Sequence, residues 1–284
     1  MDKIQSAIAK ARAQRDEKAV EQDEDQTIKR RATTPTAAPP PPQASQQATA
    51  AWDALPGMEI DPRLLKRNRI VSAEGGHLAV GIDMMRTRVL QQMRDNSWSR
   101  LAITSPTVAC GKSTVALNLA MSLQRQSNLR IILMEIDLRR PSLARMCGIT
   151  RAINVVAVLQ GSGSFADNAV CCAPNLAIST ASHSHRNAAE LLSSPSVPEA
   201  LSQIEALYAP DIIIFDTPPM LMTDDMMAVA RHVDCALLVA GAESTTIKEI
   251  DICERELASQ TNVMGMVLNK CRYMDKEHDY GYYD

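Results

Sequence analysis

The sequence has no long apolar run. No stretch approaches the roughly 18 consecutive apolar residues that a membrane-spanning helix needs, and the densest run, IIIF at 212–215, has the length of a strand. Any contact with a membrane is therefore expected to come through a partner.

The sequence also has no excess of charge of one sign. Its 30 basic and 33 acidic residues leave a formal net charge of −3, so the chain as a whole has no electrostatic attraction for nucleic acid, and we expect no nucleic-acid partner. A composition of 45% hydrophobic and 22% charged residues excludes a collagen-like, coiled-coil or wholly disordered chain and indicates a globular protein.

Cysteine motifs and a secretion signal are missing too. The 7 cysteines include no C-x-x-C pair, and the first residues, MDKIQSAIAKARAQ, carry charges where a secretion signal needs an apolar stretch. We therefore expect reduced thiols and a cytoplasmic protein.

Composition divides the 284 residues into three parts. Residues 1–60 carry mixed charges followed by ATTPTAAPPPPQASQQATAA, which has too few apolar side chains to offset the entropy of ordering, so we predict a disordered, proline-rich tail. Residues 61–271 have the mixed pattern of a folded domain. Residues 272–284 form a flexible, tyrosine-rich tail in this prediction.

The middle part alternates short apolar runs with longer amphipathic ones. Strands that are apolar on both faces and separated by helices indicate an α/β fold, with a mostly parallel sheet covered by helices on both faces. We predict strands at 101–104, 131–134, 176–178, 212–215, 236–240 and 263–268, and helices at 114–126, 187–207, 224–231 and 245–260.

A candidate phosphate-binding loop, SPTVACGKST, follows the first predicted strand and precedes a helix. In such a loop backbone N–H groups face an anion, while Lys112 supplies a positive charge to the outer phosphates and Ser113 a hydroxyl for Mg²⁺. The pattern is incomplete, because Pro106 stands where the strict motif has glycine; if Ala109 adopts a positive φ, it is strained by roughly 1 kcal/mol. We assign nucleotide binding to Ala109, Cys110, Gly111, Lys112, Ser113 and Thr114.

Acidic residues end two further strands. Glu135 and Asp137 follow the second run, and Asp216 follows the fourth. The carboxyl ends of parallel strands lie at one edge of a sheet, where carboxylates beside a phosphate site can hold Mg²⁺ and orient a nucleophile. We predict a catalytic centre of Lys112, Glu135, Asp137 and Asp216, with Ser113, Asp137 and Asp216 as metal ligands.

The tyrosines are concentrated at the end of the chain. A polar, acidic tail cannot bury aromatic rings, so these phenols are better explained as reaction groups than as core. Of the 5 tyrosines, four lie in the final stretch YMDKEHDYGYYD, and we assign them as phosphoacceptors: Tyr273, Tyr280, Tyr282 and Tyr283.

Together these features resemble the bacterial tyrosine kinases of the capsular and exopolysaccharide systems, in the cytoplasmic form that is separate from its membrane adaptor. The resemblance runs from about Ile70 to the end of the chain and includes SPTVACGKST, MEIDLRRP, FDTPP, MVLNK and the tyrosine tail. It implies a P-loop NTPase fold with ATP and Mg²⁺ as cofactors, held by Lys112 and Ser113. It also implies that Asn269 contacts the adenine.

The resemblance further implies a function and partners. In this family the tyrosine tail of one subunit is phosphorylated in the active site of its neighbour, and this cycle tunes polysaccharide export. We therefore expect an ATP-dependent protein-tyrosine autokinase that transfers the γ-phosphate to its C-terminal tyrosines. Its expected partners are a membrane polysaccharide co-polymerase that activates it through a cytoplasmic segment and recruits it to the inner face of the plasma membrane, further copies of itself, and a cognate tyrosine phosphatase.

The chain departs from the family pattern at two places. Glu135 stands where the family usually has aspartate, and the extra methylene moves the carboxylate by over an ångström, which leaves open whether phosphoryl transfer is retained. The family's ring interface uses a Glu-x-x-Arg-x-x-Arg helix. The aligned residues here are Val80, Asp83 and Arg86, which leaves the formation of a closed ring open.

Two alternatives remain at this point. One is an ATPase of the Min/Par kind, in which water is attacked instead of tyrosine; that group needs an early P-loop lysine where this chain has Thr107. The other is a nucleotide-binding regulator of polysaccharide export that has lost kinase activity, which the unusual residues Pro106, Ala109, Cys110 and Glu135 suggest.

Overall fold

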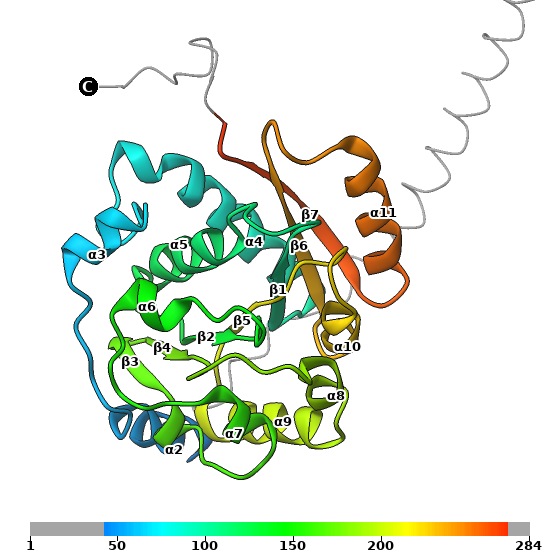
Figure 1. Cartoon of the computed structure of the whole chain (residues 1–284). Helices are drawn as coiled ribbons and strands as arrows, with labels where there is room; N and C mark the ends of the chain where they lie inside the picture. Colours follow the sequence, from blue (N-terminus) through cyan, green and yellow to red (C-terminus); the bar gives the residue numbers. More distant parts are fainter. Residues whose placement is uncertain (1–42, 272–284) are drawn as a thin grey trace, which may run out of the picture. The chain divides into compact units, whose positions relative to one another are not determined.

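The computed structural model describes residues 43–271, which contain one seven-stranded sheet (Figure 1). The strand order is β3-β4-β2-β5-β1-β6-β7, and every pairing is parallel except that of β3 with β4. The predicted fold class, a mostly parallel α/β sheet, is confirmed. The strands are β1 Arg100–Thr104, β2 Ile131–Glu135, β3 Val170–Ala173, β4 Leu176–Ser179, β5 Ile212–Asp216, β6 Cys235–Gly241 and β7 Asn262–Asn269.

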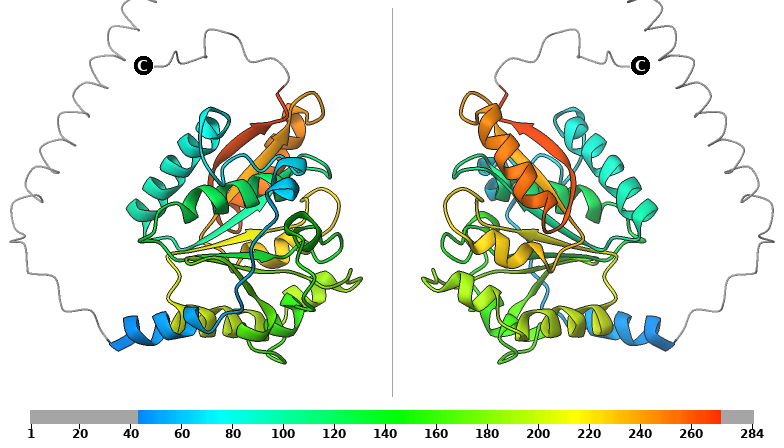
Figure 2. Two further views of the ribbon diagram at one scale, coloured as in Figure 1. Left: turned by 90° about the vertical axis from the view of Figure 1, so that its left-hand side faces the viewer. Right: turned by 90° about the vertical axis from the view of Figure 1, so that its right-hand side faces the viewer.

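Helices cover both faces of this sheet, as Figure 2 shows from the side. On one face, α4 and α5 pack against the strands; on the other face lie α7, α9 and α10. The helices are α2 Gln43–Asp53, α3 Pro62–Arg67, η1 His77–Ala79, α4 Val80–Asn96, α5 Lys112–Gln124, α6 Leu143–Cys147, α7 Val155–Leu159, η2 Ala166–Asn168, α8 Ala188–Leu192, α9 Ser196–Tyr208, α10 Asp225–Ala230 and α11 Ile247–Ala258.

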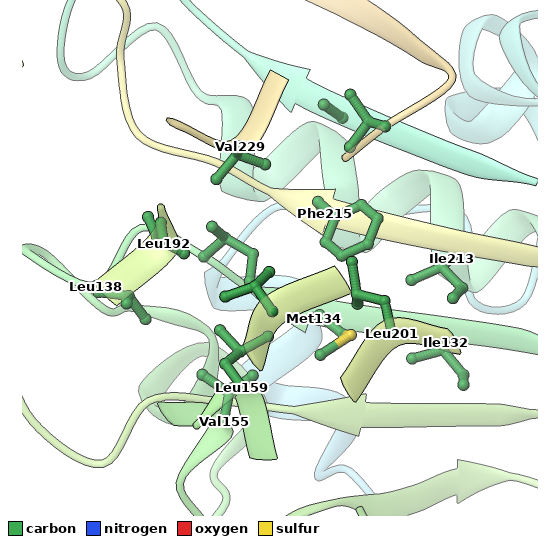
Figure 3. Close-up of a cluster of buried hydrophobic side chains, with 14 of the residues drawn as sticks. Ile132, Met134, Leu138, Val155, Leu159, Leu192, Leu201, Ile213, Phe215 and Val229 are labelled. Carbon is green, nitrogen blue, oxygen red and sulfur yellow. The ribbon is translucent and has the colours of Figure 1, made fainter. Parts of the chain in front are cut away.

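The core is divided in two by the sheet, because alternate residues of a strand face opposite sides. Ile131 and Leu133 of β2 pack with α4 and α5, whereas Ile132 and Met134 pack with α7 and α9 (Figure 3). Phe215 of β5 lies in the second cluster and is buried. Both faces of the central strands are therefore apolar, which is why these runs were readable from the sequence.

Two predicted elements differ in the structure. The expected helix at 187–207 is two helices, α8 and α9, because Pro195 interrupts the run and lies at the N-cap of α9. Strand β3 was missed, since its four residues, VCCA, are an antiparallel edge strand with only Val170 buried. Gly57 forms a β-bridge with Cys171 of this strand, so an upstream segment covers the sheet edge.

The folded unit begins earlier than the sequence predicted. Residues 43–60 were assigned to the disordered tail, but they belong to the same compact unit as the sheet. Trp52 of α2 is buried, and its indole N–H donates to the backbone carbonyl of Tyr208 in α9 at 2.8 Å. Trp52 thus anchors α2, and Leu55 and Ile60, which are also buried, extend the contact of this segment with the core. The other predicted tail positions, 1–42 and 272–284, lie outside the described residues.

None of the helices within residues 43–271 combines the length and apolar character needed to span a bilayer.

One edge of the sheet collects the strand ends that carry the predicted site residues. It is built by the carboxyl ends of β1, β2, β5, β6 and β7, which are mutually parallel and therefore meet on one side.

Candidate active site

The loop between β1 and α5 has the backbone of a phosphate cradle. Ala109 and Gly111 have left-handed conformations, with φ of 62° and 95°. The strain predicted for Ala109 is confirmed, because a residue with a Cβ occupies a conformation that glycine adopts without cost. A Cβ added to Gly111 would be strained at this φ and would displace the side-chain amide of Asn269, so glycine fits this position best.

Neighbouring strand ends hold this loop in place. The Asn269 side-chain amide, at the end of β7, donates to the carbonyl of Cys110 at 2.9 Å. The Cys110 sulfur is buried and lies 3.6 Å from the hydroxyls of both Thr107 and Thr245. Burial alone would raise the pKa of this thiol, but the hydrogen bonds from Thr245 and Thr107 hold it below its ordinary value. Asn269 therefore lies at the loop, and its predicted contact with adenine stays a prediction.

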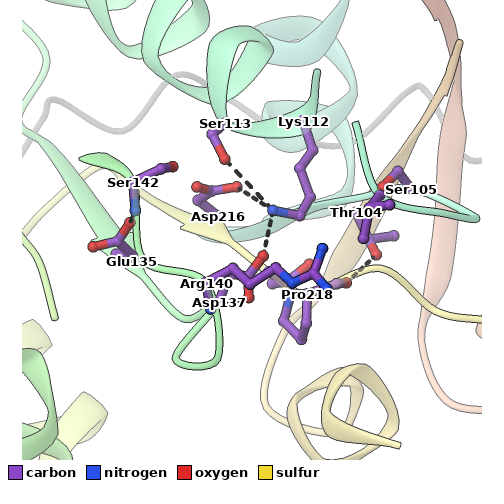
Figure 4. A network of polar contacts seen from close by, with 12 residues as sticks. Thr104, Ser105, Lys112, Ser113, Glu135, Asp137, Arg140, Ser142, Asp216 and Pro218 are labelled. Atoms are coloured by element: carbon purple, nitrogen blue, oxygen red, sulfur yellow. Dashed lines mark hydrogen bonds and ion pairs between the residues drawn. The ribbon is translucent and has the colours of Figure 1, made fainter. Parts of the chain in front are cut away.

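Lys112 begins α5, a helix whose residues from Val115 to Leu123 are all buried. A helix that is buried on all sides is fixed by packing, so the lysine projects from a rigid base. Its Nζ lies 2.6 Å from Asp137 Oδ2 and 3.7 Å from Asp216 Oδ1 (Figure 4). The Ser113 hydroxyl accepts from the same ammonium at 3.5 Å.

Three separate strand ends thus bring one ammonium and two carboxylates together. Asp216, the last residue of β5, is 0% exposed and Asp137 is 4% exposed. The Asp216 carbonyl accepts the backbone N–H groups of Ile136 and Asp137 at 2.8 and 2.9 Å, which fixes the chain beyond β2 against β5. The predicted convergence of Lys112, Asp137 and Asp216 is present in the structure.

Asp216 has unused binding capacity. Both of its carboxylate oxygens are buried, and within residues 43–271 neither receives a hydrogen bond of ordinary length; the hydroxyl of Ser113 and the ammonium of Lys112, 3.7 Å from Oδ1, are the donors beside them. Burial raises the pKa of Asp216, and the charge of Lys112 opposes that effect. Burial would lower the pKa of Lys112, but Asp216 and Asp137 raise it above its ordinary value. A buried carboxylate whose one ionic partner, Lys112, lies 3.7 Å away has room for a divalent cation, because hard cations take oxygen ligands.

Glu135 is not brought into this cluster. Its carboxylate accepts backbone N–H groups from Ser142, from Leu143 at 2.7 Å and from Ala181 at 3.1 Å. Figure 4 shows it beside Ser142, away from the ammonium of Lys112. Burial raises the pKa of Glu135 to about 7, although these hydrogen bonds oppose the shift. Its predicted catalytic role therefore has no direct contact to support it.

Asp225 is a further buried carboxylate near the site, and it is fully paired. Asp225, 1% exposed, accepts two hydrogen bonds from the guanidinium of Arg139 at 2.6 and 2.9 Å. Arg140, the next residue, is exposed, and its backbone N–H donates to Asp137 Oδ1 at 3.2 Å. Arg139 therefore holds α10 against the loop that carries Asp137.

The last of the predicted site residues to be located are Thr114 and the C-terminal tyrosines. Thr114 lies in the first turn of α5, where its carbonyl accepts from the side chain of Asn118 at 2.9 Å. The phosphoacceptor candidates Tyr273, Tyr280, Tyr282 and Tyr283 lie outside the described residues. Sequence reasoning missed Thr245, whose hydroxyl contacts Cys110 and accepts the N–H of Gly241; its position after the end of a strand was the available signal.

The residues aligned with the family's ring interface lie in the first half of α4. Asp83 is occupied within its own chain: it accepts from the Ser122 hydroxyl at 2.5 Å and pairs with Arg86 and Arg125. Val80 is 49% exposed. The formation of a closed ring stays an open prediction.

Comparison with known proteins identifies the family. The sequence profile of the ParA family, described as NUBPL iron-transfer P-loop NTPase, matches residues 98–281. The tyrosine-protein kinase YwqD of Bacillus subtilis is 30% identical over 202 residues, which cover 70% of this chain and 83% of that protein. The tyrosine-protein kinase wzc of Salmonella typhi is 30% identical over 210 residues, which cover 72% of this chain and only 28% of that longer protein.

Solved structures agree with the sequence relatives. The kinase domain of the Escherichia coli tyrosine kinase ETK has a TM-score of 0.61 and 27% identity, covering 71% of this chain and 79% of that domain. The fold, the phosphate cradle and the relatives lead to one conclusion. This chain belongs to the ParA-type P-loop NTPases and, within them, to the bacterial tyrosine kinases.

Proposed function

We propose that this protein is an ATP-dependent tyrosine kinase that transfers the γ-phosphate to tyrosines of its own C-terminal tail. The observation that carries the proposal is the meeting of Lys112, Asp137 and Asp216 at the mouth of the phosphate cradle, with both Asp216 oxygens buried and without a hydrogen bond of ordinary length from the described residues. The proposed acceptors are Tyr273, Tyr280, Tyr282 and Tyr283.

Each group has a defined task in this proposal. The N–H groups of the loop and the Lys112 ammonium bind the phosphates, and Ser113, Asp137 and Asp216 hold Mg²⁺. When bound, Mg-ATP supplies the γ-phosphoryl group and a cation that neutralises charge on the phosphate oxygens. Asp137 orients the attacking phenol and accepts its proton. The α5 helix keeps Lys112 in place, since phosphoryl transfer depends mainly on positioning and on charge.

The resemblance to the kinases of capsular and exopolysaccharide systems supports the biological setting of the proposal. A membrane polysaccharide co-polymerase activates the kinase and brings it to the membrane, and a cognate phosphatase removes phosphate from the tail. Phosphorylation adds about −1.5 to −2 charge to each modified tyrosine, which is enough to alter contacts between copies of the chain.

Mass spectrometry of the tail tests the proposal. The protein is purified from a phosphatase-deficient host, and phosphate is expected on residues 272–284 of the wild type but not of Lys112→Ala. Mg-ATP at about 100 times its Kd should also stabilise the wild type by roughly 2.7 kcal/mol, and Lys112→Ala should lose this gain. Release of inorganic phosphate without phosphotyrosine would instead support an ATPase of the Min/Par kind.

A further inference from the structure

The proposed mechanism does not use the buried carboxylate of Glu135. This side chain is 0% exposed and directly precedes the loop that carries Asp137. In the register of the sheet, Glu135 of β2 is paired with Asp216 of β5, so the two side chains leave the sheet on the same face. Despite this, its hydrogen bonds go to the opposite end of its own loop and to a neighbouring loop.

The first pair of contacts closes the loop between β2 and α6. One carboxylate oxygen accepts the backbone N–H groups of Ser142 and Leu143, where α6 begins. The loop between these points contains Asp137, whose own N–H is held by Asp216 at 2.9 Å. The loop is therefore fixed at its start by the carbonyl of Asp216 and at its end by the carboxylate of Glu135.

The third contact adds a second loop to the arrangement. The other oxygen of Glu135 accepts the N–H of Ala181, which follows β4. The chain beyond Ala181 then bonds to the same β2–α6 loop: His185 N–H donates to the Leu138 carbonyl at 2.8 Å, and the Ser184 hydroxyl donates to the Arg139 carbonyl at 2.7 Å. Two loops are thus connected through one carboxylate.

The length of the side chain explains why glutamate serves here. An aspartate at this position would end over an ångström closer to the backbone of β2 and so farther from the N–H groups of Ser142 and Ala181. A carboxylate that accepts three N–H groups has most of its hydrogen-bonding capacity used, so it is satisfied without Lys112 or a metal ion. The glutamate, unlike the family's usual aspartate, is therefore long enough to bond to both loops.

We propose that Glu135 is a positioning residue: it clamps the β2–α6 loop to the loop after β4 and so keeps Asp137 at Lys112, and it does not bind the metal ion. This inference rests on the proposed kinase function for its kinetic consequence. The clamp itself is a property of the free protein.

Two substitutions of Glu135 distinguish a clamp from a metal ligand or catalytic acid, because the two roles predict opposite orders of kinase activity for the variants. Glu135→Gln keeps the length, and its amide oxygen retains the bonds from Ser142 and Leu143, whereas Glu135→Asp keeps the charge and loses the reach. If Glu135 is a clamp, Glu135→Asp loses about 100-fold in kcat/KM for Mg-ATP, because Asp137, which is assigned both to Mg²⁺ and to the attacking phenol, shifts by about an ångström. Glu135→Gln then retains more activity than Glu135→Asp. A metal ligand or catalytic acid requires the reverse order.

Amide hydrogen exchange of the protein without nucleotide supplies a test that does not depend on kinase activity. Peptides covering Ser142, Leu143 and Ala181 should exchange about tenfold faster or more in Glu135→Asp than in the wild type, because bonds to a charged acceptor are lost. Glu254→Gln, an exposed glutamate on α11, is the matched control and should change neither exchange nor kinetics.

Specific outcomes of the exchange and kinetic experiments would refute the clamp role of Glu135. Unchanged exchange in Glu135→Asp would remove the clamp, as would an active Glu135→Asp beside an inactive Glu135→Gln, or equal kinetic losses in both. If the wild type shows no kinase activity, the proposed function fails but the exchange experiment still decides whether the clamp exists. If Glu135→Asp does not fold, exchange at Ala181 in Glu135→Gln takes its place, since the amide nitrogen faces that N–H; no acceleration there would refute the clamp.

Discussion

Asp216→Asn should make the protein without nucleotide more stable while removing its response to nucleotide. The wild-type site places two carboxylates, 0% and 4% exposed, around the single ammonium of Lys112. Lys112 keeps its closer partner, Asp137 at 2.6 Å, when Asp216 becomes neutral. The substitution therefore removes a buried charge without leaving the lysine unpaired.

The magnitude follows from the hydrogen bonding of the two oxygens. A buried acceptor without a hydrogen bond costs about 1 to 3 kcal/mol, and more when charged. Asparagine removes the charge but also the 3.7 Å ion pair with Lys112, so we expect a net gain of about 1 to 2 kcal/mol. For a domain of this size that is a rise in Tm of roughly 2 to 8 °C.

Asp225→Asn is the matched control, because it makes the same chemical change at an equally buried site. Asp225 is 1% exposed, but its oxygens accept two hydrogen bonds from Arg139 and one from Thr223. Loss of the charge weakens these bonds, so Asp225→Asn should lower stability by about 1.5 to 3 kcal/mol. One substitution thus stabilises and the other destabilises.

Thermal unfolding with and without Mg-ATP measures both effects. At about 100 times the wild-type Kd, the wild type and Asp225→Asn should gain roughly 2.7 kcal/mol, and Asp216→Asn should gain far less. The reasoning is refuted if Asp216→Asn lowers the stability of the nucleotide-free protein as Asp225→Asn does, or if it keeps the full nucleotide-dependent gain.

Three further predictions concern other parts of the fold. Trp52→Ala should lower the free energy of unfolding by about 3 to 5 kcal/mol in a denaturant titration, because the buried indole anchors α2; a loss below about 1 kcal/mol would contradict this. Gly111→Ala should abolish the Mg-ATP thermal shift by displacing Asn269, whereas Gly161→Ala, also at positive φ but in open space, should keep it. Burial and neighbouring cations hold the pKa of His232 below its ordinary value, so the unfolded chain takes up its proton first and wild-type stability falls as pH drops below about 6.5. His232→Gln should lose less stability between pH 7.5 and 5.5 in urea titrations, and identical losses would exclude this role.

The strands were readable because their burial pattern is simple. Strands β1, β2, β5 and β6 are buried on both faces, so they form continuous apolar runs, and the functional residues follow these runs directly. The phosphate-binding loop SPTVACGKST predicted a positive φ at Ala109, and the structure has this conformation. Local sequence and tertiary position agree at these sites, which is why prediction succeeded there.

Elements whose stability depends on residues far away in the chain could not be predicted from local apolar patterns. The segment of α2 is mostly polar and follows prolines, and its place in the fold depends on the docking of Trp52 against Tyr208, with Ala48 also buried. Strand β3 has two half-buried cysteines in place of a strong apolar run. The break between α8 and α9 had a visible cause in Pro195, which the helix-length pattern concealed.

The features of the site also fall into those that the sequence predicts and those that only the tertiary structure shows. Residue types and their spacing determined the class of fold, the phosphate cradle and the meeting of Lys112 with Asp137 and Asp216, because parallel strands must bring their carboxyl ends to one edge. Only the tertiary structure decided that Glu135 bonds to two loops and that the Asp216 carboxylate receives no hydrogen bond of ordinary length within residues 43–271. The direction of a side chain depends on which backbone N–H groups lie within its reach, and those groups come from segments far apart in the chain.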